Sequence, residues 1–254
     1  LEREVIKVKS VKSRTLENGF GYVRLAQFQE RSGEDLGKAL DRLRNENGGS
    51  LKGLVLDLRN NPGGLLDQAV EVSDKFITEG LIVYTKGRED EAQMEFSALR
   101  SGTEPDYPMV VLINGGSASA SEIVAGALQD QGRAVIMGTQ SFGKGSVQTI
   151  IPLSDESGLR LTTAKYYTPN GTSIQARGIV PDIEVMQSEV KNVKDMSHFR
   201  EKDLKNHFNT ETNGDDAPQE EETLLDEETR KDFQLMRALD LLKGWTIFQG
   251  LKAA

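Results

Sequence analysis

Two glycine-rich segments carry residue types suited to acyl transfer. One is Asn60-Asn61-Pro62-Gly63-Gly64, and the other is NGGSASASE at residues 114–122; each lies between a predicted strand and a predicted helix. Glycines let backbone N–H groups point at a developing negative charge, and a helix N-terminus adds its dipole. The second segment also supplies Ser117, Ser119 and Ser121. The combination suggests a serine nucleophile beside an oxyanion hole, although serine is also a common helix N-cap.

A serine nucleophile needs a base, and histidine is poorly placed to be one. Both histidines, His198 and His207, lie in a polar stretch far from the strand–helix junctions. Lysine replaces histidine in serine–lysine variants of the catalytic triad. Lys144 is the best candidate, because glycines flank it in the segment SFGKGSVQ at residues 141–148. We expect it to be buried, since burial favours the neutral amine that accepts a proton.

Gln148 follows Lys144 by four positions. In an extended segment, positions 144, 146 and 148 share one face, so the Gln148 amide could hold the lysine amine in place. A structural interpretation remains open for these residues, because most lysines are exposed cations. A phosphate-binding loop is disfavoured by the absence of the GxxxxGK[ST] pattern. No HExxH pair is present, so no metal site is expected.

The elements that would position these residues alternate between strand and helix. Helices are predicted from an N-cap at Ser32 to Gly48-Gly49, from the NNPGG segment to about residue 76, and over 122–131. An Asn18-Gly19 hairpin is predicted near the start. The predicted strands cover residues 3–12, 22–25, 54–58, 81–85, 109–113, 134–137, 147–153 and 159–167. This alternation predicts an α/β core with substantial parallel pairing.

Composition changes after the core. We expect a core at residues 1–186, an acidic linker at 187–225 and a C-terminal helical element at 226–254. The helix is predicted over about 226–243, with Gly244 as its stop. Its apolar side chains, Phe233, Met236, Leu239 and Leu242, would dock on the core or pair with another subunit.

The bulk properties exclude several classes of protein. The 254 residues carry a net charge of −9, which leaves no basic excess for nucleic acid. There are no cysteines, so disulfides, zinc-thiolate sites and cysteine nucleophiles are excluded. No apolar run approaches the roughly 20 residues that span a bilayer. The chain starts with LEREV rather than Met, which suggests a fragment or a processed form.

Four segments in one order resemble the carboxyl-terminal processing proteases, also called tail-specific proteases. They are LDLRNNPGGLL, GGSASASEIVAGALQD, GTQSFGKGSVQ, and LTTAKYYTPNG with GIVPDIEV, and the similarity covers about residues 3–186. The resemblance implies a serine endopeptidase that cleaves proteins near their C-termini without a cofactor. It also implies a core related to the crotonase and ClpP-like ββα-superhelix.

Matched position by position, the resemblance places the nucleophile at Ser119, the base at Lys144 and a supporting amide at Gln148. It assigns the oxyanion hole to the N–H of Ala120 and to that of Gly63 or Gly64, without choosing between the glycines. The family's PDZ domain has no counterpart in this sequence, so we expect a core that depends on an activating adaptor or acts without control.

Further expectations come from the same family. They are protein or peptide substrates with C-terminal tails, a homo-oligomer and a periplasmic or cell-envelope location. Two alternatives remain. One is a non-proteolytic enzyme on the same superhelix, such as a relative of acyl-CoA hydratases. The other is a catalytically silent protease fragment that acts as an assembly or binding module.

Overall fold

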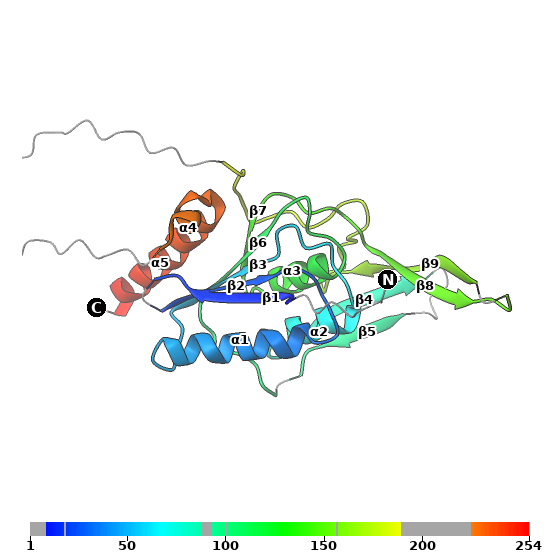
Figure 1. The fold of residues 1–254 in the computed structure, drawn as a ribbon, viewed down its shortest axis with the longest axis horizontal. Coiled ribbons are helices and arrows are strands. Elements are labelled where there is room, and N and C mark those ends of the chain that lie inside the picture. Colours follow the sequence, from blue (N-terminus) through cyan, green and yellow to red (C-terminus); the bar gives the residue numbers. More distant parts are fainter. Residues whose placement is uncertain are drawn as a thin grey trace, which may run out of the picture.

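The computed structural model describes residues 9–17, 19–87, 93–99, 101–155, 157–188 and 225–253. A central sheet has the strand order β1-β2-β3-β6-β7-β10 (Figure 1). Its strands are β1 (Val11–Thr15), β2 (Phe20–Leu25), β3 (Gly53–Asp57), β6 (Met109–Ile113), β7 (Val135–Gly138) and β10 (Ile183–Glu184). Apart from the antiparallel pair β1–β2, all neighbours are parallel, which confirms the predicted parallel α/β core.

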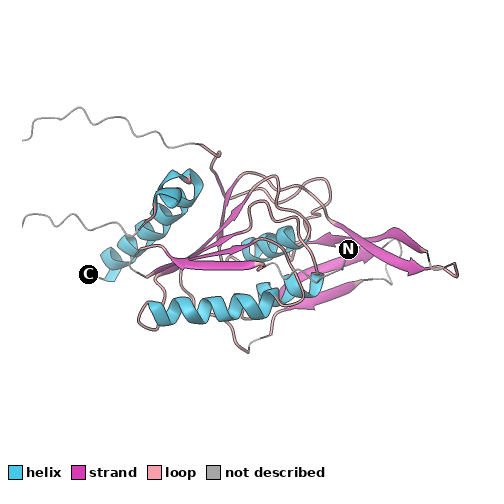
Figure 2. Ribbon diagram, in the orientation of Figure 1, coloured by secondary structure: helices cyan, strands magenta, loops and turns pink. Residues whose placement is uncertain are grey.

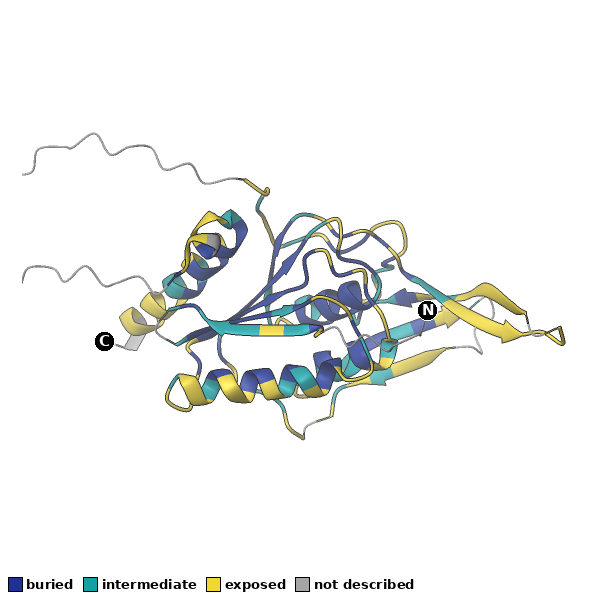
Figure 3. Cartoon of the chain, in the orientation of Figure 1, coloured by how far each residue is buried: buried dark blue, intermediate teal, exposed yellow. Residues whose placement is uncertain are grey.

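Helices cover both faces of this sheet, so its middle strands are continuously apolar. Every residue of β3 and β6 is buried. Leu54 and Leu56 face the main core, where α1 (Ser32–Glu46), α2 (Leu66–Asp74) and α3 (Ala120–Asp130) pack. Val55 faces the opposite way, toward Leu239 and Leu242 of the C-terminal helix. Figure 3 shows the resulting layers, with dark blue strands between helices.

A second sheet is antiparallel, with the order β5-β4-β9-β8. Its strands are β4 (Leu81–Gly87), β5 (Met94–Ser97), β8 (Ser146–Pro152) and β9 (Gly158–Tyr167). The β8–β9 hairpin extends away from the rest of the fold (Figure 2). Most of its residues are exposed. The sequence predicted three of these strands but missed β5, a short strand that is mostly exposed.

The C-terminal element differs from its prediction. It forms α4 (Glu227–Lys231) and α5 (Phe233–Ala253), with Asp232 between them in an extended conformation. Gly244 does not end the helix. A glycine stop needs the left-handed conformation, and Gly244 is absent from the residues with positive φ. A glycine inside a helix costs only about 1 kcal/mol relative to alanine, which the surrounding helix tolerates.

Ser32 is not the N-cap of α1, which was also predicted wrongly. The cap is Arg31, and Ser32 is the first helical residue, buried beneath the preceding turn. Its hydroxyl donates to the Gln27 carbonyl at 3.2 Å and accepts from the Gln29 N–H at 2.8 Å. The serine therefore stabilises the turn that enters the helix rather than the helix end.

Some predicted features lie outside the described residues. They are residues 3–8 of the first predicted strand, Asn18 of the hairpin, His198, His207 and most of the predicted linker. Among the helices within the described ranges, none combines the length and the apolar character of a bilayer span.

Candidate active site

The two glycine-rich loops leave neighbouring parallel strands at the same edge of the central sheet. β3 pairs with β6 so that Asp57 lies opposite Leu112, and each loop begins within three residues of that pair. Hydrogen bonds then tie the loops together. The Asn61 carbonyl accepts from the Ala118 N–H at 3.0 Å and from the Ser121 hydroxyl at 2.9 Å. The sheet thus fixes both loops as one unit.

Of the three loop serines, only Ser119 has a side chain free for chemistry. Ser117 and Ser121 are fully buried, and their hydroxyls donate to the carbonyls of Leu58 and Asn61. Ser119 is half-buried and sits at the N-cap of α3 with φ 56° and ψ −112°. A non-glycine residue held in this region costs about 1–3 kcal/mol, and such strain gathers at functional sites. A strained serine at a sharp strand-to-helix turn is the geometry of a nucleophile elbow.

The backbone donors beside Ser119 form a small group. The Ala120 N–H is in the first turn of α3, where the helix itself supplies no acceptor. Gly63 lies against this turn, since a methyl group on it would come within 2.8 Å of Ser119 Cβ and 3.0 Å of Ala120 N. Its own N–H already donates to Asn61 Oδ1 at 2.9 Å. Within the described ranges the Gly64 N–H has no acceptor, so of the two glycines Gly64 is the one whose N–H remains available.

Lys144 occupies the loop before β8, and its side chain is exposed. The prediction that it would be buried is therefore wrong for this structure. Tight packing is confined to the flanking glycines: Gly143 has φ 89°, and a methyl group on Gly145 would lie 2.3 Å from Gln175 N. The loop backbone is thus fixed, while the Lys144 side chain remains exposed.

Glu122 connects the serine loop to the lysine loop. Its buried carboxylate accepts from the Ser119 N–H at 2.8 Å and the Lys144 N–H at 2.9 Å, both at Oε2. Its Oε1 accepts from the Ser141 hydroxyl and the Gly143 N–H, each at 2.6 Å. One carboxylate oxygen therefore holds the backbones of both candidate catalytic residues. Glu122 is not among the site residues predicted from the sequence, although its position three residues after Ser119 is the spacing of a capping box.

Gln148 lies on β8 opposite Thr162 and is exposed. A register shift in the β8–β9 pairing falls between Val147 and Gln148. No hydrogen bond within the described ranges joins its amide to Lys144. The structure brings Ser119, Ala120 and Gly63 together, and Glu122 binds the backbone N–H groups of Ser119 and Lys144. Gly64 packs against Phe28, and Gln148 has no hydrogen bond to these residues within the described ranges.

Replacing Glu122 by glutamine is expected to lower kcat by about 10²-fold, the cost of an ångström-scale misplacement at a catalytic centre. Each carboxylate oxygen of Glu122 accepts two hydrogen bonds, whereas a glutamine amide has only one accepting oxygen. Its NH2 group would therefore face two N–H or O–H donors. Steady-state kinetics and a thermal melt measure the effect. Glu34→Gln, an exposed change on α1, is the control. Unchanged kcat in Glu122→Gln would refute the proposed role of the carboxylate.

Known proteases resemble this chain over much of its length. The chain is 50% identical over 244 residues to the carboxy-terminal-processing protease of Bartonella bacilliformis, covering 95% of this chain and 56% of that protein. It is 44% identical over 167 residues to the carboxyl-terminal-processing protease of Synechocystis sp., covering 66% of this chain and 38% of that protein. It therefore spans about half or less of these relatives' lengths.

A solved photosystem II D1 C-terminal processing protease superimposes with a TM-score of 0.65 and 35% identity, over 72% of this chain and 50% of that one. The family model that matches, described as peptidase family S41, covers residues 19–185 and with them both glycine-rich loops. The resemblance to the carboxyl-terminal processing proteases is confirmed, and the chain belongs to peptidase family S41.

Proposed function

We propose that this chain is the catalytic core of a serine endopeptidase that cleaves protein substrates near their C-termini. The observation that carries the proposal is the Glu122 carboxylate, which binds the backbones of Ser119 and Lys144 through one oxygen. Beside it, the strained Ser119 begins a helix whose first N–H faces no helical acceptor. Together these features supply a nucleophile, a base and an oxyanion donor within one small region.

The reaction would proceed through an acyl-enzyme. The neutral amine of Lys144 takes the hydroxyl proton of Ser119 as the serine oxygen attacks a peptide carbonyl. The carbonyl oxygen gains negative charge and accepts hydrogen bonds from the N–H groups of Ala120 and Gly64. The lysine, now charged, protonates the leaving amine and becomes neutral again. It then takes a proton from water, which attacks the acyl-enzyme, and returns that proton to the Ser119 oxygen as the acyl group leaves.

Substrate binding would complete the site. Lys144 is exposed in the free protein, and its amine must be neutral to act as a base. A peptide laid across the loop would exclude water and favour that neutral form. Substrate binding would also bring the Gln148 amide toward the Lys144 amine. The amide oxygen could then accept a hydrogen bond from the amine and orient it. No step of this mechanism uses a cofactor.

The proposal also covers the substrates, the cellular location and the domain organisation of the chain. The substrates would be proteins or peptides whose C-terminal tails carry an apolar residue before the scissile bond, in the periplasm or cell envelope. Residues 1–186 would form the protease core and 187–225 a linker. Docking of α5 (in 226–254) on the central sheet supports a stable C-terminal element. An activating adaptor and a homo-oligomer are further expectations from the family.

Mass spectrometry of a tailed substrate tests the function. A folded protein with an unstructured C-terminal tail containing apolar residues is incubated with the chain, alone and with a PDZ-containing component. Cleavage confined to the tail, absent with Ser119→Ala, supports the proposal. Intact substrate under both conditions, with binding detected by light scattering, would favour a silent binding module instead. Failure of a fluorophosphonate to label Ser119 would favour a non-proteolytic enzyme.

A further inference from the structure

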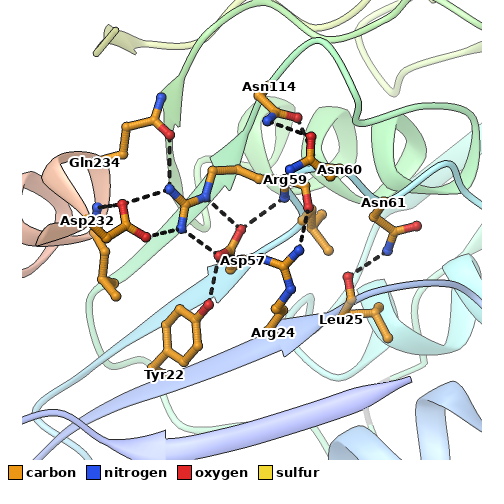
Figure 4. A network of polar contacts seen from close by, with 12 residues as sticks. Tyr22, Arg24, Leu25, Asp57, Arg59, Asn60, Asn61, Asn114, Asp232 and Gln234 are labelled. Carbon is orange, nitrogen blue, oxygen red and sulfur yellow. Dashed lines mark hydrogen bonds and ion pairs between the residues drawn. The ribbon is translucent and has the colours of Figure 1, made fainter. Parts of the chain in front are cut away.

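Arg59 lies directly before the Asn60–Gly64 turn, and a network of polar contacts surrounds its side chain (Figure 4). Asp57, the last residue of β3, accepts from the Arg59 N–H at 2.9 Å and from Nε at 3.0 Å through Oδ1. Its other oxygen accepts from Arg59 Nη2 and from the Tyr22 hydroxyl, each at 2.7 Å. Asp57 is fully buried and the Arg59 side chain is 8% exposed.

The far side of the same guanidinium binds the C-terminal element. Asp232 accepts from Nη1 at 2.8 Å and from Nη2 at 2.6 Å, a bidentate pair. Gln234 Oε1 accepts from Nη1 at 3.0 Å. Asp232 sits at the break between α4 and α5, and its carboxylate also accepts from the Leu235 N–H at 3.1 Å. It thus caps α5 and holds Arg59 at the same time.

The charges in this network are mutually dependent. Burial by itself would lower the pKa of Arg59, but the hydrogen bonds and charges of Asp232 and Asp57 outweigh it and raise that pKa above its ordinary value. Burial and then the Asp57 charge raise the pKa of Tyr22, which keeps its hydroxyl a donor. Removing one carboxylate would leave a buried guanidinium half-paired, which strongly disfavours this arrangement.

The turn that follows Arg59 is tightly constrained. Asn60 has φ 57°, and its N–H donates to Asn114 Oδ1 at 2.9 Å. The Arg59 carbonyl accepts from Arg24 Nη2 at 3.4 Å. The turn ends at Gly63, which lies against Ser119, and at Gly64, which lies against Phe28. A shift of Arg59 would therefore be transmitted along a few residues to the amides that face the reacting carbonyl.

We propose that Asp232 is a positioning residue, which holds Arg59 from the C-terminal element and through it the Asn60–Gly64 turn that completes the oxyanion hole. This inference rests on the proposed function. It assigns the C-terminal element, which lies beyond residues 19–185 matched by the family model, a part in catalysis. Oxyanion contacts strengthen as charge develops, so their misplacement lowers kcat more than it changes KM.

Asp232→Asn tests the proposal, because it keeps the side chain's size and removes its charge. The expected result is a fall of about tenfold or more in kcat with KM changed by less than about twofold. Amide hydrogen exchange over residues 60–64 should accelerate, while exchange in β6 stays as in the parent. Asp240→Asn is the matched control: the same change on α5, at an exposed pair with Arg237. Asp232→Glu, which retains the charge, should recover most of the lost kcat.

Each outcome decides the matter. A lower thermal midpoint in Asp232→Asn, with kcat and exchange at 60–64 unchanged, would show a purely structural residue and overturn the inference. If the parent chain cleaves nothing, the proposed function fails, and the exchange measurement still decides whether Asp232 fixes the turn. Should Asp232→Asn not fold, Gln234→Met removes a single Arg59 contact and should move kcat and exchange in the same direction by a smaller factor.

Discussion

Ser119→Ala is expected to abolish proteolysis, lowering kcat by about 10⁴-fold or more while the protein stays folded. Alanine removes the only atom that would form the acyl-enzyme. It leaves the backbone contacts of the loop, including the bond from the residue 119 N–H to Glu122. The free energy of unfolding should fall by no more than about 0.5–2 kcal/mol, because Ser119 is the N-cap of α3 and alanine cannot cap a helix. Kinetics on a tailed substrate and a thermal melt measure both effects.

Ser117→Ala and Ser121→Ala are matched controls two positions to either side. Each removes a buried hydroxyl that donates to a backbone carbonyl, so each should lower the free energy of unfolding by about 1–3 kcal/mol. Both variants should still cleave the substrate below their melting temperatures. Loss of cleavage in Ser117→Ala with retention in Ser119→Ala would show that the nucleophile has been assigned to the wrong serine.

The positions of the glycine-rich loops could be predicted from the sequence because local signals mark them. A continuous apolar strand, a glycine-rich turn and a helix start follow one another twice, at β3–α2 and at β6–α3. Parallel pairing then brings the two turns to one edge of the sheet. These local signals did not distinguish among the three serines, so the prediction of Ser119 depended on the family resemblance. The burial of Ser117 and Ser121 is a physical reason that favours the same choice.

Contacts distant in the sequence explain what could not be predicted. Glu122 reads as an ordinary residue in the first turn of a helix, and its role appears only when the loop at residues 141–144 folds against it. The role of Arg59 similarly depends on its contact with Asp232, which lies 173 positions later in the chain. The exposure of Lys144 was mispredicted because glycine neighbours constrain a backbone but do not determine what covers the side chain.

Lys144→Arg is expected to reduce kcat by about 10²–10⁴-fold, the usual contribution of a general base. Arginine keeps the positive charge and the length of the side chain, but its guanidinium cannot be deprotonated in a protein. It could therefore bind the substrate backbone as lysine does and still fail to take the Ser119 proton. Lys144→Ala should lose as much activity, because neither variant supplies a base.

The pH dependence separates a base from a residue that only binds. In the parent protein kcat/KM should climb as pH rises, since the neutral amine of Lys144 is the active form. Lys144→Arg should lose that rise, whereas Lys38→Arg, at an exposed ion pair on α1, should retain it. A Lys144→Arg protein with parental activity and an unchanged pH profile would exclude the lysine as the base.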